Sequence, residues 1–209
     1  LTSETAFYPM TPTEAFTIVG SNQFPVELAK RHKAFLEEEN ITGQTVKLTA
    51  RKDGSILREF TDDVIVKTFP VKPNEDNTGA TVIFEEPILG SPAGTYIAGA
   101  DPYAHDESNT STSIGVLYIY KRMLSVNDTY VDEIVAYLAG RPPTRKMWHQ
   151  QAELLMDYYN AICMPENETQ TFVQYFDGLN KSYMLADGLQ LLKEVSPSTD
   201  VKRSKGLPP

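Results

Sequence analysis

The spacing of hydrophobic and polar positions changes twice along the chain. In VELAKRHKAFLEEEN the apolar residues recur at helical spacing with charges opposite them, which predicts an amphipathic helix that ends near Gly43. The earlier segment TPTEAF has a capping threonine and a proline at the first helical position, which predicts a short helix. From Gln44 to Leu89 the period becomes two. TVKLTAR and SILREF flank the turn KDGS and predict a hairpin, and DVIVKTFPV and ATVIFEEPIL predict two more strands.

Strand and helix patterns alternate in the rest of the chain. TYIAGAD, SIGVLYIYKRM and YVDEIVAYLAG predict three strands whose short polar connections permit antiparallel neighbours. RPPTRKMWHQQAELLMDYYN predicts a helix, AICMP a short buried strand, TQTFVQYFDGL a second helix and SYMLAD a last strand. The residues expected to face the core from the two helices are Trp148, Ala152, Leu155, Tyr159, Phe172, Phe176 and Leu179.

The order βββαβαβ predicts an α/β fold with a mixed sheet. Three antiparallel strands come first, and two crossovers then add parallel strands. In this order the first strand of the group, TYIAGAD, and its fourth strand, AICMP, can lie side by side at the centre of the sheet.

The amino-acid composition excludes some classes of protein for this chain. Hydrophobic residues make up 41% of the 209, which is enough for a sizeable core, and no apolar run approaches the ~20 residues that a membrane helix needs. A single cysteine, Cys163, excludes an internal disulfide, fits a reducing cytosol and is expected as a core thiol. Because the formal net charge is -9, any contact with nucleic acid must use a local basic patch. The candidates for such a patch, each of which could equally be a scattered solubilising charge, are Lys121, Arg122, Arg141, Arg145, Lys146, Lys202, Arg203 and Lys205.

Two acids stand where predicted strands end. Asp101 closes TYIAGAD and Glu166 follows AICMP, so the predicted order brings both to one edge of the sheet. Converging carboxylates repel each other, a divalent cation relieves that repulsion, and oxygen ligands suit Mg²⁺ or Mn²⁺. The alternative is that Asp101 is a turn residue before a proline and that Glu166 begins a helix. Asp106 is a further candidate metal ligand, and Glu107 and Glu168 could assist it.

Other chemical signals are weaker. His105 lies near Asp101 and is expected to be an exposed loop residue, and His149 is expected at the surface near the start of a helix. The sequence contains no zinc-ligand spacing and no G-x-x-x-x-G-K-[ST] loop, so it does not predict a nucleotide-binding site of the P-loop kind.

Several segments together resemble the large terminase subunit of tailed bacteriophages. YPMTPTEAF followed by QFP resembles the stretch that joins the packaging ATPase of that family to its nuclease. TVIFEEPILGSPAGTYIAGADP resembles the run into the nuclease, and IVAYLAGRP followed by AELLMDYYNAICMPENE resembles its third strand, first helix and fourth strand. The resemblance covers about Tyr8 to Asp187, and it depends on the order and spacing of motifs that are individually short.

The resemblance implies a nuclease of the RNase H/RuvC-like fold that cleaves concatemeric viral DNA by a two-metal mechanism. In that family the acids that end the first and fourth strands are catalytic metal ligands, and they match Asp101 and Glu166. The third acid of the family lies on a helix after the fifth strand. No residue here matches it, which implies a nuclease core truncated at its C-terminal end.

The implied organisation has three parts: a helical linker over residues 1–43, a β-rich segment packed on the nuclease over 44–94, and the nuclease core over 95–209. The implied cofactor is Mg²⁺ or Mn²⁺, and the implied partner is double-stranded DNA, with the portal protein and the small terminase subunit as candidate protein partners and no membrane. The implied location is the cytoplasm of the bacterial host, at the procapsid during packaging.

Two other interpretations stay open. The chain could be a non-catalytic docking module that binds the portal or the small terminase subunit through its acidic surface and its β-rich segment. It could also be another RNase H-like nuclease, such as a resolvase or a transposase.

Overall fold

The computed structural model describes residues 25–66, 70–71, 75–103, 105–106, 113–122, 133–166, 170–188 and 205–206. The chain divides into two compact units, Leu1–Thr42 and Gly43–Pro209. None of the helices formed by the described residues is both long enough and apolar enough to cross a membrane.

In the first unit the described helix is α3 (Val26–Glu38), which confirms the predicted amphipathic helix. Its first turn carries Glu27, whose negative charge interacts favourably with the N-terminal end of the helix dipole. The helix has no buried residue, and the side chains of Leu28 and Phe35 are 62% and 50% exposed. The segment TPTEAF lies outside the described residues.

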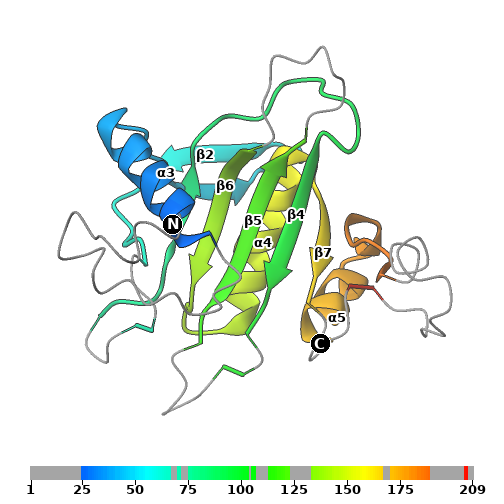
Figure 1. Ribbon diagram of the computed structural model, residues 1–209. Helices are drawn as coiled ribbons and strands as arrows, with labels where there is room; N and C mark the ends of the chain where they lie inside the picture. Colours follow the sequence, from blue (N-terminus) through cyan, green and yellow to red (C-terminus); the bar gives the residue numbers. More distant parts are fainter. Residues whose placement is uncertain are drawn as a thin grey trace, which may run out of the picture. The chain divides into compact units, whose positions relative to one another are not determined.

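The second unit contains a seven-stranded mixed sheet in the order β2-β1-β3-β6-β5-β4-β7 (Figure 1). Its strands are β1 (Gln44–Ala50), β2 (Ile56–Phe60), β3 (Ala80–Ile83), β4 (Tyr96–Asp101), β5 (Gly115–Lys121), β6 (Glu133–Gly140) and β7 (Ile162–Pro165). The β-rich segment shares this sheet, because β3 pairs antiparallel with β6 and β1 pairs with both β2 and β3. The predicted mixed α/β fold is therefore confirmed at the level of its sheet and helices.

The predicted strand order is observed in the second half of the chain. β4, β5 and β6 are consecutive antiparallel neighbours, and β7 then returns parallel to β4. The connection between β6 and β7 contains the helix α4 (Arg145–Tyr159). The adjacency of the first and fourth strands of this group is thus confirmed. Their predicted place at the centre of the sheet is wrong, because β7 is the last strand of the described sheet and no described strand pairs beyond it.

The ends of α4 follow from its sequence. Thr144 caps the start, where its side-chain oxygen accepts a hydrogen bond from the backbone N–H of Met147. Asn160 ends the helix in the left-handed conformation, which asparagine tolerates better than most residues. The buried face predicted for this helix is confirmed, because Trp148, Ala152, Leu155 and Tyr159 are all buried.

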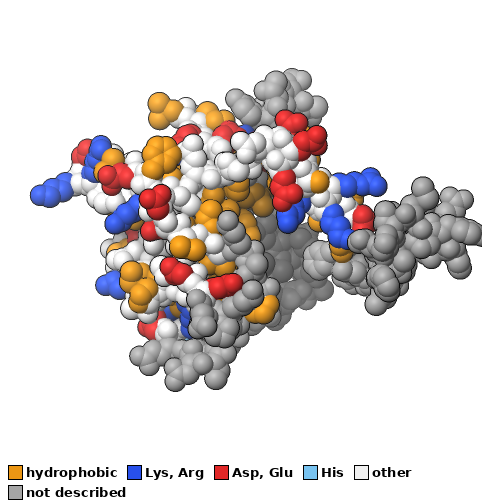
Figure 2. Space-filling model, turned by 90° about the vertical axis from the view of Figure 1, so that its left-hand side faces the viewer, with side chains coloured by type: hydrophobic (Ala, Val, Ile, Leu, Met, Phe, Trp, Pro, Cys, Tyr) orange, Lys and Arg blue, Asp and Glu red, His pale blue; other side chains and the backbone are white. Residues whose placement is uncertain are grey.

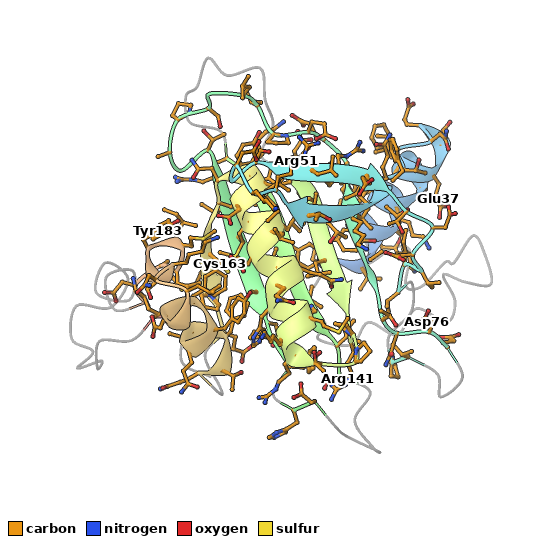
Figure 3. All side chains as sticks on the ribbon, turned by 180° about the vertical axis from the view of Figure 1, so that it is seen from behind. Glu37, Arg51, Asp76, Arg141, Cys163 and Tyr183 are labelled. Carbon is orange, nitrogen blue, oxygen red and sulfur yellow. The ribbon has the colours of Figure 1, made fainter. Side chains whose placement is uncertain are left out.

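The helix α4 lies across one face of the sheet, seen behind the strands in Figure 1 and in front of them in Figure 3. The side chains of β4 alternate between buried and exposed along the whole strand, because successive residues point to opposite faces. Leu117 and Ile119 of β5 are fully buried on the face that α4 covers. The described helices of this unit leave the opposite face open.

The second predicted helix is also present, as α5 (Thr171–Gly178). Phe172 and Phe176 are buried as predicted, whereas Leu179 is 44% exposed, so its predicted inward orientation is wrong. Leu179 lies one residue beyond the end of α5, where the backbone no longer continues the helical spacing.

Two predicted strands are wrong. SYMLAD forms a 3-10 turn, η1 (Ser182–Met184), and its strand-type pairing with β7 is limited to an isolated bridge between Leu185 and Cys163. The local hydrogen bonds of η1 use the backbone groups that a longer ladder would need. DVIVKTFPV forms no strand in its described residues, 63–66 and 70–71.

Candidate functional site

Asp101 and Glu166 lie at the ends of neighbouring parallel strands. Alternation along β4 places Asp101 on the open face of the sheet together with Ile97 and Gly99. The parallel pairing of β4 with β7 continues to Ala100 opposite Pro165, and the backbone N–H of Glu166 donates a hydrogen bond to the carbonyl oxygen of Ala100 at 2.7 Å. The strand ladder therefore delivers the two acids to adjacent positions at one end of the sheet.

Both acids line one open depression of about 660 Å³ on this face. Its lining residues are Gly99, Ala100, Asp101, Val116, Tyr118, Met164 and Glu166. Both acids are exposed, and neither carboxylate forms an ion pair or a hydrogen bond with any other described residue.

The donor set of the depression fits a hard divalent cation better than a soft one. It offers carboxylate oxygens, and the described residues contain no group of three His, Cys, Asp or Glu side chains that could hold a metal ion. Mg²⁺ is commonly bound through one or two carboxylates, with waters and substrate phosphates completing its coordination. Asp101 and Glu166 are the two carboxylate residues of the lining that could hold such a cation.

Sequence reasoning missed five residues that complete the depression: Gly99, Ala100, Val116, Tyr118 and Met164. The signal for three of them was the period of two within the strands. Gly99 lies two residues before Asp101, and the β4–β5 register places Asp101 opposite Val116 and Gly99 opposite Tyr118. The register between neighbouring strands decides these partners, and a single sequence does not specify that register.

Asp106 lies in a different setting from the carboxylate pair. Its Oδ1 accepts a hydrogen bond from the backbone N–H of Arg145 at 2.5 Å and lies 3.2 Å from the Nε of the same residue. The backbone hydrogen bond from Arg145, at the first turn of α4, holds the pKa of Asp106 below its ordinary value. Asp106 does not line the depression and acts in the structure as a partner of the α4 N-terminus. Glu107 and Glu168, the two assisting candidates, lie outside the described residues.

Arg141 anchors the chain that follows Asp101. Its guanidinium lies 4.5 Å from the ring centroid of Tyr103 and donates hydrogen bonds to the carbonyl oxygens of His105, at 2.6 Å, and Ser113, at 2.8 Å. Figure 3 shows Arg141 beside the N-terminal end of α4. His105 is exposed, as predicted, and contributes its backbone carbonyl to this anchor.

The prediction that His149 lies at the surface is wrong. Its side chain is only 5% exposed and packs against the rings of Phe172 and Tyr175, because α5 covers this part of α4. Burial, and then the positive charge of Arg145, lower the pKa of His149 to about 4. Cys163 is fully buried, which confirms the predicted core thiol, and burial raises the pKa of its thiol well above the ordinary range.

Lys121, a candidate for a DNA-contacting patch, is 2% exposed and lies between two acids. Its ammonium is 2.5 Å from the carboxylate of Glu85 and 2.6 Å from that of Glu133. Burial by itself would lower the pKa of Lys121, but the hydrogen bonds to Glu133 and Glu85 outweigh it and raise the pKa above its ordinary value. Lys121 is therefore a buried structural cation in this protein.

The other basic candidates differ in their exposure and in the local contacts that they make. Arg141 and Arg145 make the local contacts described above, Lys205 donates to the carbonyl oxygen of Leu185, and Arg122 and Lys146 are exposed. Lys202 and Arg203 lie outside the described residues. On the face shown in Figure 2 basic and acidic side chains are intermixed, so the visible described charges form no patch of one sign there.

A second cavity, of about 390 Å³, lies between β1, β3 and α4. Its lining mixes apolar residues such as Leu48 and Leu154 with polar ones such as Thr81 and Gln151, and its charged members are Lys47 and Asp63. It contains neither Asp101 nor Glu166, so it is separate from the carboxylate pair.

Comparison with known proteins identifies no relative of this chain. The chain matches no protein family, and no curated protein and no solved structure is significantly similar to it.

Proposed function

We propose that this chain is the nuclease part of a phage DNA-packaging terminase, a divalent-metal-dependent endonuclease that hydrolyses phosphodiester bonds of double-stranded DNA. The observation that carries the proposal is the hydrogen bond from Glu166 N–H to the Ala100 carbonyl, which sets Glu166 beside Asp101 in one open depression. The resemblance of the sequence motifs to the terminase large subunit gives this pair its chemical context.

The strand order supports an RNase H-like core as part of the proposal. Three antiparallel strands, β4 to β6, are followed by α4 and by β7 parallel to β4. In open sheets with parallel strands, functional residues gather beyond the strand ends, where neighbouring chains diverge. Asp101 and Glu166 occupy such a position.

In the proposed reaction Asp101 and Glu166 would hold the divalent cation through their carboxylate oxygens. When bound, Mg²⁺ or Mn²⁺ supplies an activated water and stabilises the leaving oxygen of the phosphodiester. The proposal places the protein in the cytoplasm of the bacterial host, at the procapsid.

The test is the paired replacement of Asp101→Asn and Glu166→Gln in the 209-residue chain. Each removes one negative charge while keeping side-chain size, so Mg²⁺- or Mn²⁺-dependent nicking of plasmid DNA should fall by at least ~100-fold, the usual scale for losing a preorganised catalytic group. Because both side chains are exposed, circular dichroism and thermal unfolding should match the original chain.

A matched control is Asp63→Asn, which removes the same charge from an exposed acid that lines the other cavity. It should cleave like the original chain. Wild-type rates in both Asp101→Asn and Glu166→Gln would refute the proposal.

A docking module is the second candidate, and the exposure of α3 favours it. Leu28 and Phe35 belong to an apolar helix face that no described residue buries, and such a face is typical of a segment that binds a further protein surface. Capture of portal protein or small terminase subunit that is equally strong with and without divalent metal, in a chain that shows no nuclease activity, favours this candidate.

A further inference from the structure

Gly99 forms the floor of the depression in the middle of an ordinary strand. Glycine weakens strands, because it has no side chain to pack and loses more conformational freedom on folding than any other residue. A glycine inside a strand therefore calls for one of three reasons: a left-handed backbone, crowding by neighbouring atoms, or the close approach of a ligand or another backbone.

Other glycines of this unit show the first two reasons. Gly79 has a φ of +79°, and a Cβ there would lie 2.1 Å from the carbonyl oxygen of Ala139. A Cβ at Gly115 would lie 2.5 Å from Cε2 of Trp148, whose ring packs directly on the strand. A side chain at either position would disturb the fold.

Neither of these reasons applies to Gly99. Its φ is not in the left-handed region, and a Cβ built there would have no described atom within 4 Å. It is exposed, and the register places it between Met164 of β7 and Tyr118 of β5. The missing side chain thus leaves a notch between these two residues, beside Asp101 and Glu166.

We infer that Gly99 admits the substrate strand, and that the nucleoside next to the scissile phosphate lies in this notch. The inference rests on the proposed function. Gly99 precedes Asp101 by two residues on the same face, which is ~7 Å along a strand, so a phosphate held at the carboxylate pair brings its neighbouring sugar over Gly99.

The chemistry of the notch fits a sugar and base rather than a second phosphate. Val116 and Met164 are apolar, none of the described lining residues is basic, and the ring of Tyr118 is 45% exposed. Bases stack on such rings without regard to sequence, and Tyr118 is itself held by the ring of Tyr137 at a centroid distance of 5.9 Å. Gly99 is therefore a residue that determines access to the site, and it needs no contact with the metal.

Gly99→Ala and Gly99→Val test this in the 209-residue chain. The probes are Mn²⁺ alone, measured by calorimetry, and a fluorescein-labelled DNA duplex with Ca²⁺, measured by anisotropy. Both variants should keep the Mn²⁺ affinity and should melt no lower than the original chain, because a side chain fits the strand there. The dissociation constant for DNA should rise modestly for Gly99→Ala and by ~10-fold or more for Gly99→Val, since displacement by about 1 Å is costly in such sites.

The control is Ile97→Phe, which adds similar bulk on the same face of β4 but outside the depression, and its DNA affinity should not change. If Gly99→Val binds and cleaves DNA like the original chain, the inference fails while the proposed function stands. If the original chain binds DNA without cleaving it, and Gly99→Val does not bind, the nuclease proposal fails while the notch remains a DNA-contact site. Absence of DNA binding by the original chain would overturn both.

Discussion

The two faces of the seven-stranded sheet differ in what covers them, although the same strands form both. Leu117 and Ile119 of β5 are fully buried on the face beneath α4. Their neighbour Tyr118 is 45% exposed on the other face, and Ile97 of β4 is 37% exposed there. Because successive side chains point to opposite faces, one strand contributes both to the core and to the open face that carries Asp101.

Because of this difference, one face of the sheet contributes most to stability and the other carries the candidate site. The covered face brings together the buried side chains of the strands and of α4, so its apolar burial accounts for most of the stability that the sheet gains. The open face has few buried contacts around Asp101 and Glu166, and changes there should alter binding more than stability. Three measurements test this contrast.

The largest effect is expected from two adjacent positions on opposite faces. Leu117→Ala should lower the free energy of unfolding by about 2–5 kcal/mol, because it leaves a cavity in a fully packed core. Tyr118→Ala should lower it by about 1 kcal/mol or less, since its ring is half exposed and mainly contacts Tyr137. Urea unfolding followed by circular dichroism measures both, and equal losses would mean that the open face is covered in solution.

Acid should weaken the covered side of the molecule through His149. Its pKa is lowered to about 4 in the folded chain, against about 6.5 in the unfolded chain. Above pH 6.5 both states are neutral there and the stability is fully present. Between pH 6.5 and 4 only the unfolded state takes up the proton, so the free energy of unfolding falls as the pH falls, and below pH 4 the loss stays constant.

The loss should reach about 2 kcal/mol, because each pKa unit corresponds to 1.36 kcal/mol and nearby solvent screens part of it. Urea unfolding at a series of pH values measures it. His149→Phe, which keeps a ring between Phe172 and Tyr175, should lack this part of the pH dependence. An unchanged profile in that variant would assign the acid sensitivity to other groups.

The smallest effect is expected on the open face itself. Ile134→Thr keeps a β-branched side chain at a position that is 49% exposed, so the free energy of unfolding should change by about 0.5 kcal/mol or less. Ile119→Thr, the same substitution at a fully buried position, should cost several times more, because it buries a hydroxyl in place of a methyl group. Similar costs at the two positions would remove the contrast between the faces.

Much of the local structure was predictable from the sequence, and particular residues show why. The apolar spacing of Trp148, Ala152, Leu155 and Tyr159 predicted both the existence and the buried face of α4. Such a pattern is local, since residues three and four apart share one side of a helix. For the same reason the hairpin of β1 and β2 follows from two alternating segments around a turn.

The predictions were wrong for residues whose neighbours in the structure come from distant parts of the chain. His149 is buried because α5 packs over it, and Lys121 is buried between Glu85 and Glu133, acids that precede and follow it in sequence. SYMLAD has the composition of a strand, but its strand-type pairing with β7 is limited to Leu185. In each case the residue types were compatible with two environments, and packing selected one of them.

The candidate site combines both kinds of information. Neighbours along the chain were enough to predict that Asp101 ends an apolar strand, that Glu166 follows another and that a helix separates the two strands. The packed fold was needed to establish the register in which β7 sets Glu166 next to Asp101. It was also needed to show that Asp106 joins the start of α4 and that Gly99 leaves a notch between Met164 and Tyr118. Strand order and register depend on the free energy of the whole packed sheet, to which every strand and α4 contribute, and no short segment of the sequence contains that sum.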